Sequence, residues 1–155
     1  MASKEAEAFL QQVREYQKQA LGSATAVPTL EEMRFGAEAV METVGAMPSG
    51  VELENVDVNG LSAIWVRHPE ADAQSVVMYF HGGGYVVQSA HSHRKVAAHL
   101  AIQSKRNVLS VNYRLAPEHT HPAAVNDAIT AYQWLLSAGY ASNKIAISGD
   151  SAGGG

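Results

Sequence analysis

Alternating apolar and polar positions predict two adjacent strands about one third of the way along the chain. Apolar residues recur at close to every second position over residues 51–58 and again over 61–66, on either side of Asn59-Gly60. Asn-Gly between two such runs is the strongest short-range hairpin signal, because both residues tolerate the left-handed backbone of a type I′ turn. The pattern therefore predicts an antiparallel hairpin.

Three further apolar runs, at residues 75–80, 107–112 and 144–148, are typical of strands covered on both faces. Helical spacing separates them, over residues 92–105 and 123–138. Strands that alternate with helices in this way predict right-handed crossovers and a mostly parallel sheet, an α/β fold. In the second helix the residues predicted to face inward are Val125, Ala128, Ile129, Tyr132, Leu135 and Leu136.

Two helices are predicted before any strand, over Lys4 to Leu21 and from Thr29 to about Val44. The second opens with Thr29 and Glu32, the spacing of a capping box. Because they precede the whole sheet, we expect an N-terminal helical cap at residues 1–46 and an α/β domain at residues 47–155.

Composition narrows the class of protein. The 155 residues are 46% apolar and 17% charged, with 11 basic against 15 acidic side chains and a net charge of −4. These values are typical of a globular protein, and no basic face suggests nucleic acid as a partner. No apolar run approaches the roughly 18 residues of a membrane-spanning helix, acids at Glu5 and Glu7 stand where a secretory signal would be basic and then apolar, and cysteine is absent. We therefore expect no transmembrane segment and a cytoplasmic protein.

Two glycine-rich motifs carry the candidate chemistry. His81-Gly82-Gly83-Gly84 follows one predicted buried strand, and Gly149-Asp150-Ser151-Ala152-Gly153 follows another. The second matches G-x-S-x-G, a sharp strand-to-helix turn that exposes a nucleophilic serine. Successive glycines let a backbone loop aim amides at the negative charge of a tetrahedral intermediate. Either motif alone is weak, but the two together predict acyl transfer through Ser151.

Other chemistries fit the sequence less well. Neither G-x-x-x-x-G-K-[ST] nor G-x-G-x-x-G is present, so a nucleotide site is not indicated. The pairs His91/His93 and His119/His121 lack a carboxylate cluster, and we interpret them as surface or turn residues rather than metal ligands. His81 is predicted to support the glycine loop by hydrogen bonding. No metal or other cofactor is expected.

Three motifs together resemble the hormone-sensitive-lipase-like family of α/β-hydrolases, the bacterial family IV esterases. They are Tyr79-Phe80-His81-Gly82-Gly83-Gly84-Tyr85, Tyr113-Arg114-Leu115-Ala116-Pro117-Glu118, and Gly149-Asp150-Ser151-Ala152-Gly153-Gly154. The resemblance covers residues 51–155 and implies the α/β-hydrolase fold, with the two leading helices as the cap. It also implies that the strand ending at Ser148 lies beside the one ending at Phe80.

The resemblance further implies a carboxylic-ester hydrolase that works through an acyl-serine intermediate without a cofactor. Ser151 would be the nucleophile, the backbone amides of Gly83, Gly84 and Ala152 would form the oxyanion hole, and His81 and Gly82 would support the loop. The substrate would be a small-molecule ester with a short to medium acyl chain, covered by the cap helices. The family's acid and histidine would lie beyond Gly155, so we expect this chain to be an incomplete, inactive part of the enzyme.

Two alternatives remain open on the residues alone. A hydrolase-fold protein can retain the pocket and the glycine loop and bind a small molecule without turnover. A 155-residue native product could also be an inactive remnant of an esterase.

Overall fold

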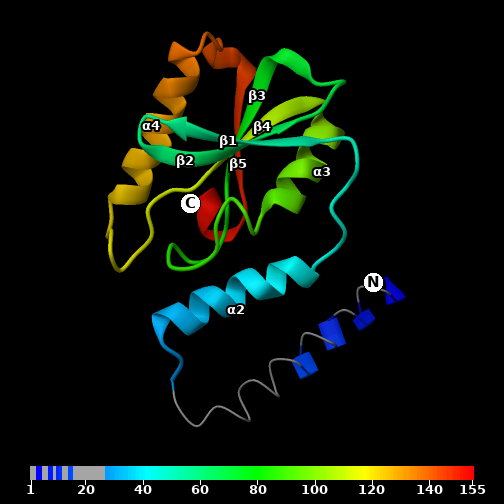
Figure 1. Ribbon diagram of the computed structural model, residues 1–155, viewed down its shortest axis with the longest axis vertical. Coiled ribbons are helices and arrows are strands. Elements are labelled where there is room, and N and C mark those ends of the chain that lie inside the picture. The colour runs from blue at the N-terminus through cyan, green and yellow to red at the C-terminus, as the bar shows by residue number, and fades with distance from the viewer. Residues whose placement is uncertain (1–2, 5–6, 9, 12–13, 16–26) are drawn as a thin grey trace. The chain divides into compact units, whose positions relative to one another are not determined.

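A five-stranded mixed sheet is the centre of the structure, a computed structural model that describes residues 3–4, 7–8, 10–11, 14–15 and 27–155 (Figure 1). The sheet order is β1-β2-β4-β3-β5. β1 pairs antiparallel with β2 and β2 with β4, whereas β3 is parallel to both β4 and β5. The mostly parallel sheet with an antiparallel hairpin is therefore confirmed. The strands are β1 Glu52–Val58, β2 Leu61–Arg67, β3 Asp72–Phe80, β4 Arg106–Val111 and β5 Ile145–Gly149.

The β1–β2 turn has the predicted geometry. Asn59 and Gly60 have φ angles of 53° and 89°, the two left-handed residues that a type I′ turn requires. The Gly60 amide also donates to Asp57 Oδ1 at 3.0 Å. The register from Glu52↔Arg67 to Val58↔Leu61 follows from this two-residue turn.

Helices cover the two faces of the sheet. Helix α3 (Arg94–Ser104) lies on one face and α4 (Ala123–Ser137) on the other (Figure 1). Successive β3 residues contribute to opposite cores: Met78 and Phe80 belong to the cluster that includes Leu135 of α4, and Val77 and Tyr79 to the cluster that includes the alanines of α3. Short 3₁₀ turns complete the elements, η1 at Ser142–Lys144 and η2 at Ser151–Gly154.

The inward face of α4 differs from the sequence prediction. Leu135 is fully buried as predicted, but Val125, Ile129 and Leu136 are 40–50% exposed. The fully buried side is formed instead by Ala131 and Leu135, with Asp127 almost completely covered. The apolar stripe of α4 is wider than the surface that the sheet covers, and its exposed residues Val125, Ile129 and Leu136 line a groove beside the helix.

Helix α2 (Leu30–Thr43) begins at the predicted capping box. The Glu32 amide donates to Thr29 Oγ1 at 3.2 Å, and the Thr29 amide donates to Glu32 Oε2 at 2.7 Å. The chain separates into two compact units, Met1–Met33 and Arg34–Gly155. The helix predicted over Lys4 to Leu21 falls largely outside the described residues, and the division into a cap of residues 1–46 and a domain of 47–155 stays a prediction.

Candidate active site

The two glycine motifs meet because β3 and β5 are neighbours. Their last paired residues are Phe80 and Gly149, so both motifs begin at the same edge of the sheet. Parallel strands deliver their carboxyl ends to one edge, and that edge is where open α/β sheets bind ligands. The predicted pairing of the strand through Ser148 with the strand ending at Phe80 is confirmed.

The turn that carries Ser151 is tight and left-handed. Ser151 has a φ of 49°, uncommon for a residue other than glycine, and its side chain is exposed. The Gly153 amide donates to the carbonyl oxygen of Asp150 at 2.8 Å and closes the turn. An exposed serine in this conformation, directly after a strand, has the geometry expected of a nucleophile elbow.

Close approach of the backbone explains why glycine stands on both sides of Ser151, at positions 149 and 153. A Cβ on Gly149 would overlap the carbonyl oxygen of Gly153, and a Cβ on Gly153 would overlap that of Phe80. Neither obstacle is a flexible side chain that could move aside. Both glycines are therefore required by the close packing between the turn and the end of β3.

The glycine loop is compact and is closed by hydrogen bonds. Gly83 and Gly84 have φ angles of 112° and 63°, and the amides of Val86 and Val87 both donate to the Gly83 carbonyl oxygen, at 3.1 and 3.0 Å. A Cβ on Gly83 would overlap the carbonyl oxygen of Val87. A side chain at this position would open the turn, so glycine is required there.

The Asp150 carboxylate joins the serine turn to the glycine loop. Its Oδ1 accepts a hydrogen bond from the Gly82 amide at 2.9 Å and another from the Tyr79 hydroxyl at 2.6 Å. Its Oδ2 lies 3.5 Å from His93 Nε2. A Cβ on Gly82 would lie 3.2 Å from Ser151 Cβ, which shows how closely loop and serine approach. Burial and the hydrogen bond to Asp150 raise the pKa of Tyr79, so its hydroxyl stays a donor.

Sequence reasoning did not assign Asp150, Tyr79 or His93 to the site. Asp150 occupies a variable position of the G-x-S-x-G motif, and Tyr79 reads as one more apolar residue of a buried strand. His93 was predicted to be a surface or turn residue, and this is wrong, since it is 3% exposed. It is the N-cap residue of α3, and its ring packs beside those of His81 and Tyr79, with centroids 5.7 and 6.4 Å apart. The predicted exposure of His91, His119 and His121 is confirmed.

His81 is packed beneath the loop. Its Nδ1 lies 2.6 Å from the Gly82 carbonyl oxygen, which can only accept, so Nδ1 carries the proton. Its ring stacks on Tyr113 with centroids 4.3 Å apart and planes 13° from parallel. The Tyr113 hydroxyl donates to the His81 carbonyl oxygen at 2.6 Å. Burial lowers the pKa of His81 and raises that of Tyr113 to about 12, so both side chains are neutral at pH 7.

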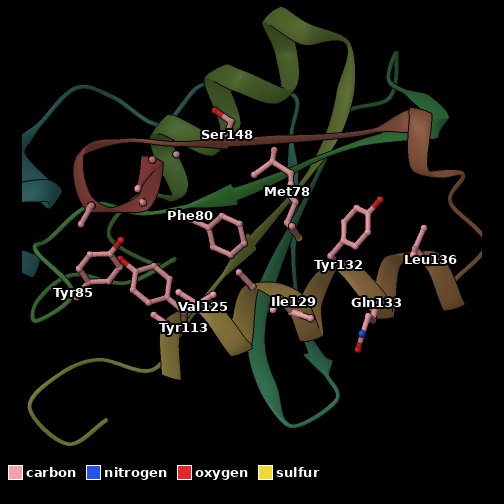
Figure 2. Close-up of a pocket in the computed structure, with 18 residues that line it drawn as sticks. Met78, Phe80, Tyr85, Tyr113, Val125, Ile129, Tyr132, Gln133, Leu136 and Ser148 are labelled. Carbon is pink, nitrogen blue, oxygen red and sulfur yellow. The ribbon is translucent and has the colours of Figure 1, made fainter. Parts of the chain in front are cut away.

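An apolar groove of about 920 Å³ lies below the serine turn, between β5 and α4 (Figure 2). Met78 and Phe80 of β3 and Tyr132 of α4 point into it, whereas the Ser148 hydroxyl points away. The groove reaches the site through Tyr85, Tyr113 and the turn residues Ala152, Gly153 and Gly154. Ile147 of β5, beside it, is 65% exposed.

The structure therefore brings every predicted site residue to one edge of the sheet: Ser151, Gly83, Gly84, Ala152, His81 and Gly82. Two histidine rings lie nearby, and each already has a partner, His81 the Gly82 carbonyl oxygen and His93 Asp150. Within the described part of the chain, no three His, Cys, Asp or Glu side chains are grouped to hold a metal ion.

Comparison with known proteins agrees with this geometry. The family model described as the alpha/beta hydrolase fold matches residues 77–155, which include both glycine motifs. The structure superimposes on an esterase from the bacterial hormone-sensitive lipase family with a TM-score of 0.86 and 37% identity, over 99% of this chain and 49% of that one. The chain belongs to the hormone-sensitive-lipase-like α/β-hydrolases.

Curated relatives of this α/β-hydrolase are named as an acetyl-hydrolase and an esterase. An acetyl-hydrolase of Streptomyces hygroscopicus is 36% identical over 81% of this chain and 42% of its own length. The esterase LipI of Mycobacterium tuberculosis is 42% identical over 83% of this chain and 45% of its own length. The chain thus spans a little under half the length of these relatives. Among the described residues, no helix is both long and apolar enough to cross a membrane.

Proposed function

We propose that the whole protein hydrolyses carboxylic esters of small molecules, with short to medium acyl chains, through an acyl-enzyme formed on Ser151. The observation that carries the proposal is the left-handed, exposed Ser151 on a tight turn directly beside a glycine loop. Relatives named as esterases and acetyl-hydrolases support the same reaction class.

In the proposed reaction, Ser151 Oγ attacks the ester carbonyl carbon while a base accepts its proton. The amides of Gly83, Gly84 and Ala152 would stabilise the oxyanion of the tetrahedral intermediate. The intermediate then expels the alcohol, which receives the proton back, and water releases the acid from the acyl-serine by the reverse roles. Removing one oxyanion donor typically lowers kcat by about a hundredfold to a thousandfold.

Neither His81 nor His93 is proposed as the base, because each ring already contacts another group, His81 the Gly82 carbonyl oxygen and His93 the Asp150 carboxylate. In α/β-hydrolases the acid and the histidine follow the serine in the chain. We therefore expect the catalytic acid and histidine of the full-length protein to lie C-terminal to Ser151. The 155 residues alone should then hydrolyse esters far more slowly than the full-length protein, since donors without a base retain only a small part of catalysis.

The test uses the full-length protein with p-nitrophenyl esters from acetate to decanoate. Ser151→Ala should abolish nitrophenol release, and Ser148→Ala, a serine three residues earlier that points away from the groove, should retain it. A fluorophosphonate should add its mass to the peptide that contains Ser151. Undiminished hydrolysis by Ser151→Ala would refute the nucleophile assignment, and tight ester binding without turnover would favour a binding protein.

A further inference from the structure

One arginine side chain reaches both loops that border the candidate site. Arg34, in α2, donates from Nε to the Val86 carbonyl oxygen at 2.9 Å and from Nη2 to the Ala116 carbonyl oxygen at 3.1 Å. Its Nη1 and Nη2 also donate to Glu118 Oε1 and Oε2, both at 2.7 Å. The guanidinium thus makes four hydrogen bonds to three residues.

The three residues that accept these hydrogen bonds belong to two segments that are far apart in the chain. Val86 lies in the turn that closes on the Gly83 carbonyl oxygen, and Ala116 and Glu118 lie in the turn after β4. The two turns touch directly, since the Ala116 amide donates to the Tyr85 carbonyl oxygen at 2.8 Å. Arg34 therefore bridges the two turns at the point where they touch. One of these turns, through Val86, continues into the glycine loop.

The ion pair itself contributes little to stability. The side chains of Arg34 and Glu118 are 31% and 49% exposed, and pairs in such positions are screened by water. The distinguishing property of Arg34 is its geometry, because the planar guanidinium can donate hydrogen bonds to a carboxylate and to two backbone carbonyl oxygens at the same time. A lysine would keep the charge but not this set of directions.

The opposite end of α2 is held by different residues. Lys95 Nζ donates to the carbonyl oxygens of Glu42 at 2.6 Å and Gly45 at 3.0 Å. Arg94 Nη2 donates to Glu42 Oε2 at 2.7 Å. These contacts attach the helix near α3 without touching the glycine loop, so attachment of α2 and contact with the loop can be separated by mutation.

We propose that Arg34 is a positioning residue for the oxyanion loop. By fixing Val86 against the Tyr113–Glu118 turn, it holds the Gly83 and Gly84 amides in the direction that the transition state requires. This inference rests on the proposed function. Its consequence is that α2 sets the geometry of the oxyanion donors.

The kinetic test compares Arg34→Gln, Arg34→Lys and the control Arg94→Gln in the full-length protein. Arg34→Gln should lower kcat for p-nitrophenyl butyrate by about tenfold to a hundredfold, the range for small misplacement of catalytic groups. KM should change by less, because the donors act mainly in the transition state. Arg34→Lys should not restore kcat, and Arg94→Gln should stay within about twofold of wild type.

A second readout does not depend on activity. In Arg34→Gln the amides of Val86, Val87 and Ala116, whose hydrogen bonds lie within and between the two turns, should exchange with deuterium about tenfold faster than in wild type. Arg94→Gln should leave their exchange unchanged. Glu118→Gln, which keeps the two carbonyl contacts of Arg34, should show a smaller acceleration than Arg34→Gln.

The outcomes separate the two proposals. A wild-type protein without hydrolysis, in which Arg34→Gln still loosens these amides, would refute the esterase and leave Arg34 only a structural role in holding the glycine loop. Hydrolysis by wild type together with unchanged kcat and exchange in Arg34→Gln would overturn the positioning role. Full recovery of kcat by Arg34→Lys would also overturn it, because charge alone would then suffice.

Discussion

Asp150 Oδ1 accepts a hydrogen bond from the backbone amide of Gly82 at 2.9 Å. The residue before the candidate nucleophile therefore also holds the glycine loop. The Tyr79 hydroxyl donates to the same oxygen at 2.6 Å. The serine turn and the glycine loop are therefore connected through one carboxylate, and a change at Asp150 should affect both.

Removing the Asp150 carboxylate should reduce ester hydrolysis more than removing the Tyr79 hydroxyl that donates to it. Asp150→Ala leaves the Gly82 amide without its acceptor, and we expect a loss of about tenfold or more in kcat/KM. Tyr79→Phe retains the Gly82 contact and should lower the free energy of unfolding by about 1 kcal/mol, the value of one hydrogen bond. Ester hydrolysis and urea denaturation measure the two effects. Equal losses of activity in both variants would contradict the connection through Gly82.

The two neighbouring glycines after Ser151 should respond differently to an added methyl group. Gly153→Ala places a Cβ against the Phe80 carbonyl oxygen and should destabilise the protein by about 2 kcal/mol or more. Gly154→Ala is the matched control, because its Cβ would lie 3.6 Å from the Gly149 carbonyl oxygen, an ordinary contact. Thermal and denaturant unfolding of both variants provide the test. A Gly153→Ala protein as stable as Gly154→Ala would show that the turn relaxes without cost.

The buried carboxylate of Asp127 should matter more than an exposed one. Asp127 is 3% exposed in its side chain and accepts the Arg114 amide at 2.8 Å and Arg114 Nη2 at 2.6 Å. Asp127→Ala removes both contacts and should cost about 2–3 kcal/mol of unfolding free energy, below the full value for a buried pair because Arg114 is half exposed. Glu54→Ala, in the exposed pair with Arg67, should cost less than about 1 kcal/mol. Similar costs for the two variants would refute this assignment.

Stability should depend on pH through His81. Burial lowers its pKa in the folded protein below the ordinary value of 6.5. Below pH 6.5 the unfolded chain therefore binds a proton that the folded chain does not, and stability falls as pH decreases, by at most about 1.4 kcal/mol per pH unit. His81→Gln should show a shallower decrease between pH 7 and pH 5. Parallel curves for the two proteins would show that His81 does not titrate in this window.

Features that depend on near neighbours in the chain were predictable. The hairpin at Asn59-Gly60 follows from which residues tolerate a positive φ, and the start of α2 follows from the reciprocal bonds of Thr29 and Glu32. The buried strands follow from runs too apolar to face water. The two glycine motifs also identified the edge of the sheet where the candidate site lies.

Features that depend on distant parts of the chain were not predictable. The exposed stripe of α4 was misassigned because the sequence shows that Ile129 is apolar, but not how far the sheet extends to cover it. His93 was misassigned because its burial depends on the rings of His81 and Tyr79, which the fold brings beside it.

By itself, then, the sequence determined the element types, the turn chemistry and the candidate nucleophile, since these depend on backbone conformation and on residues a few positions apart. The tertiary structure alone decided the partners of the site. Gly82 and Asp150 are 68 positions apart, and Arg34 and Glu118 are 84 apart. Such pairs meet only in the folded chain: the pairing of β3 with β5 brings Gly82 to Asp150, and the packing of α2 brings the Arg34 side chain to Glu118.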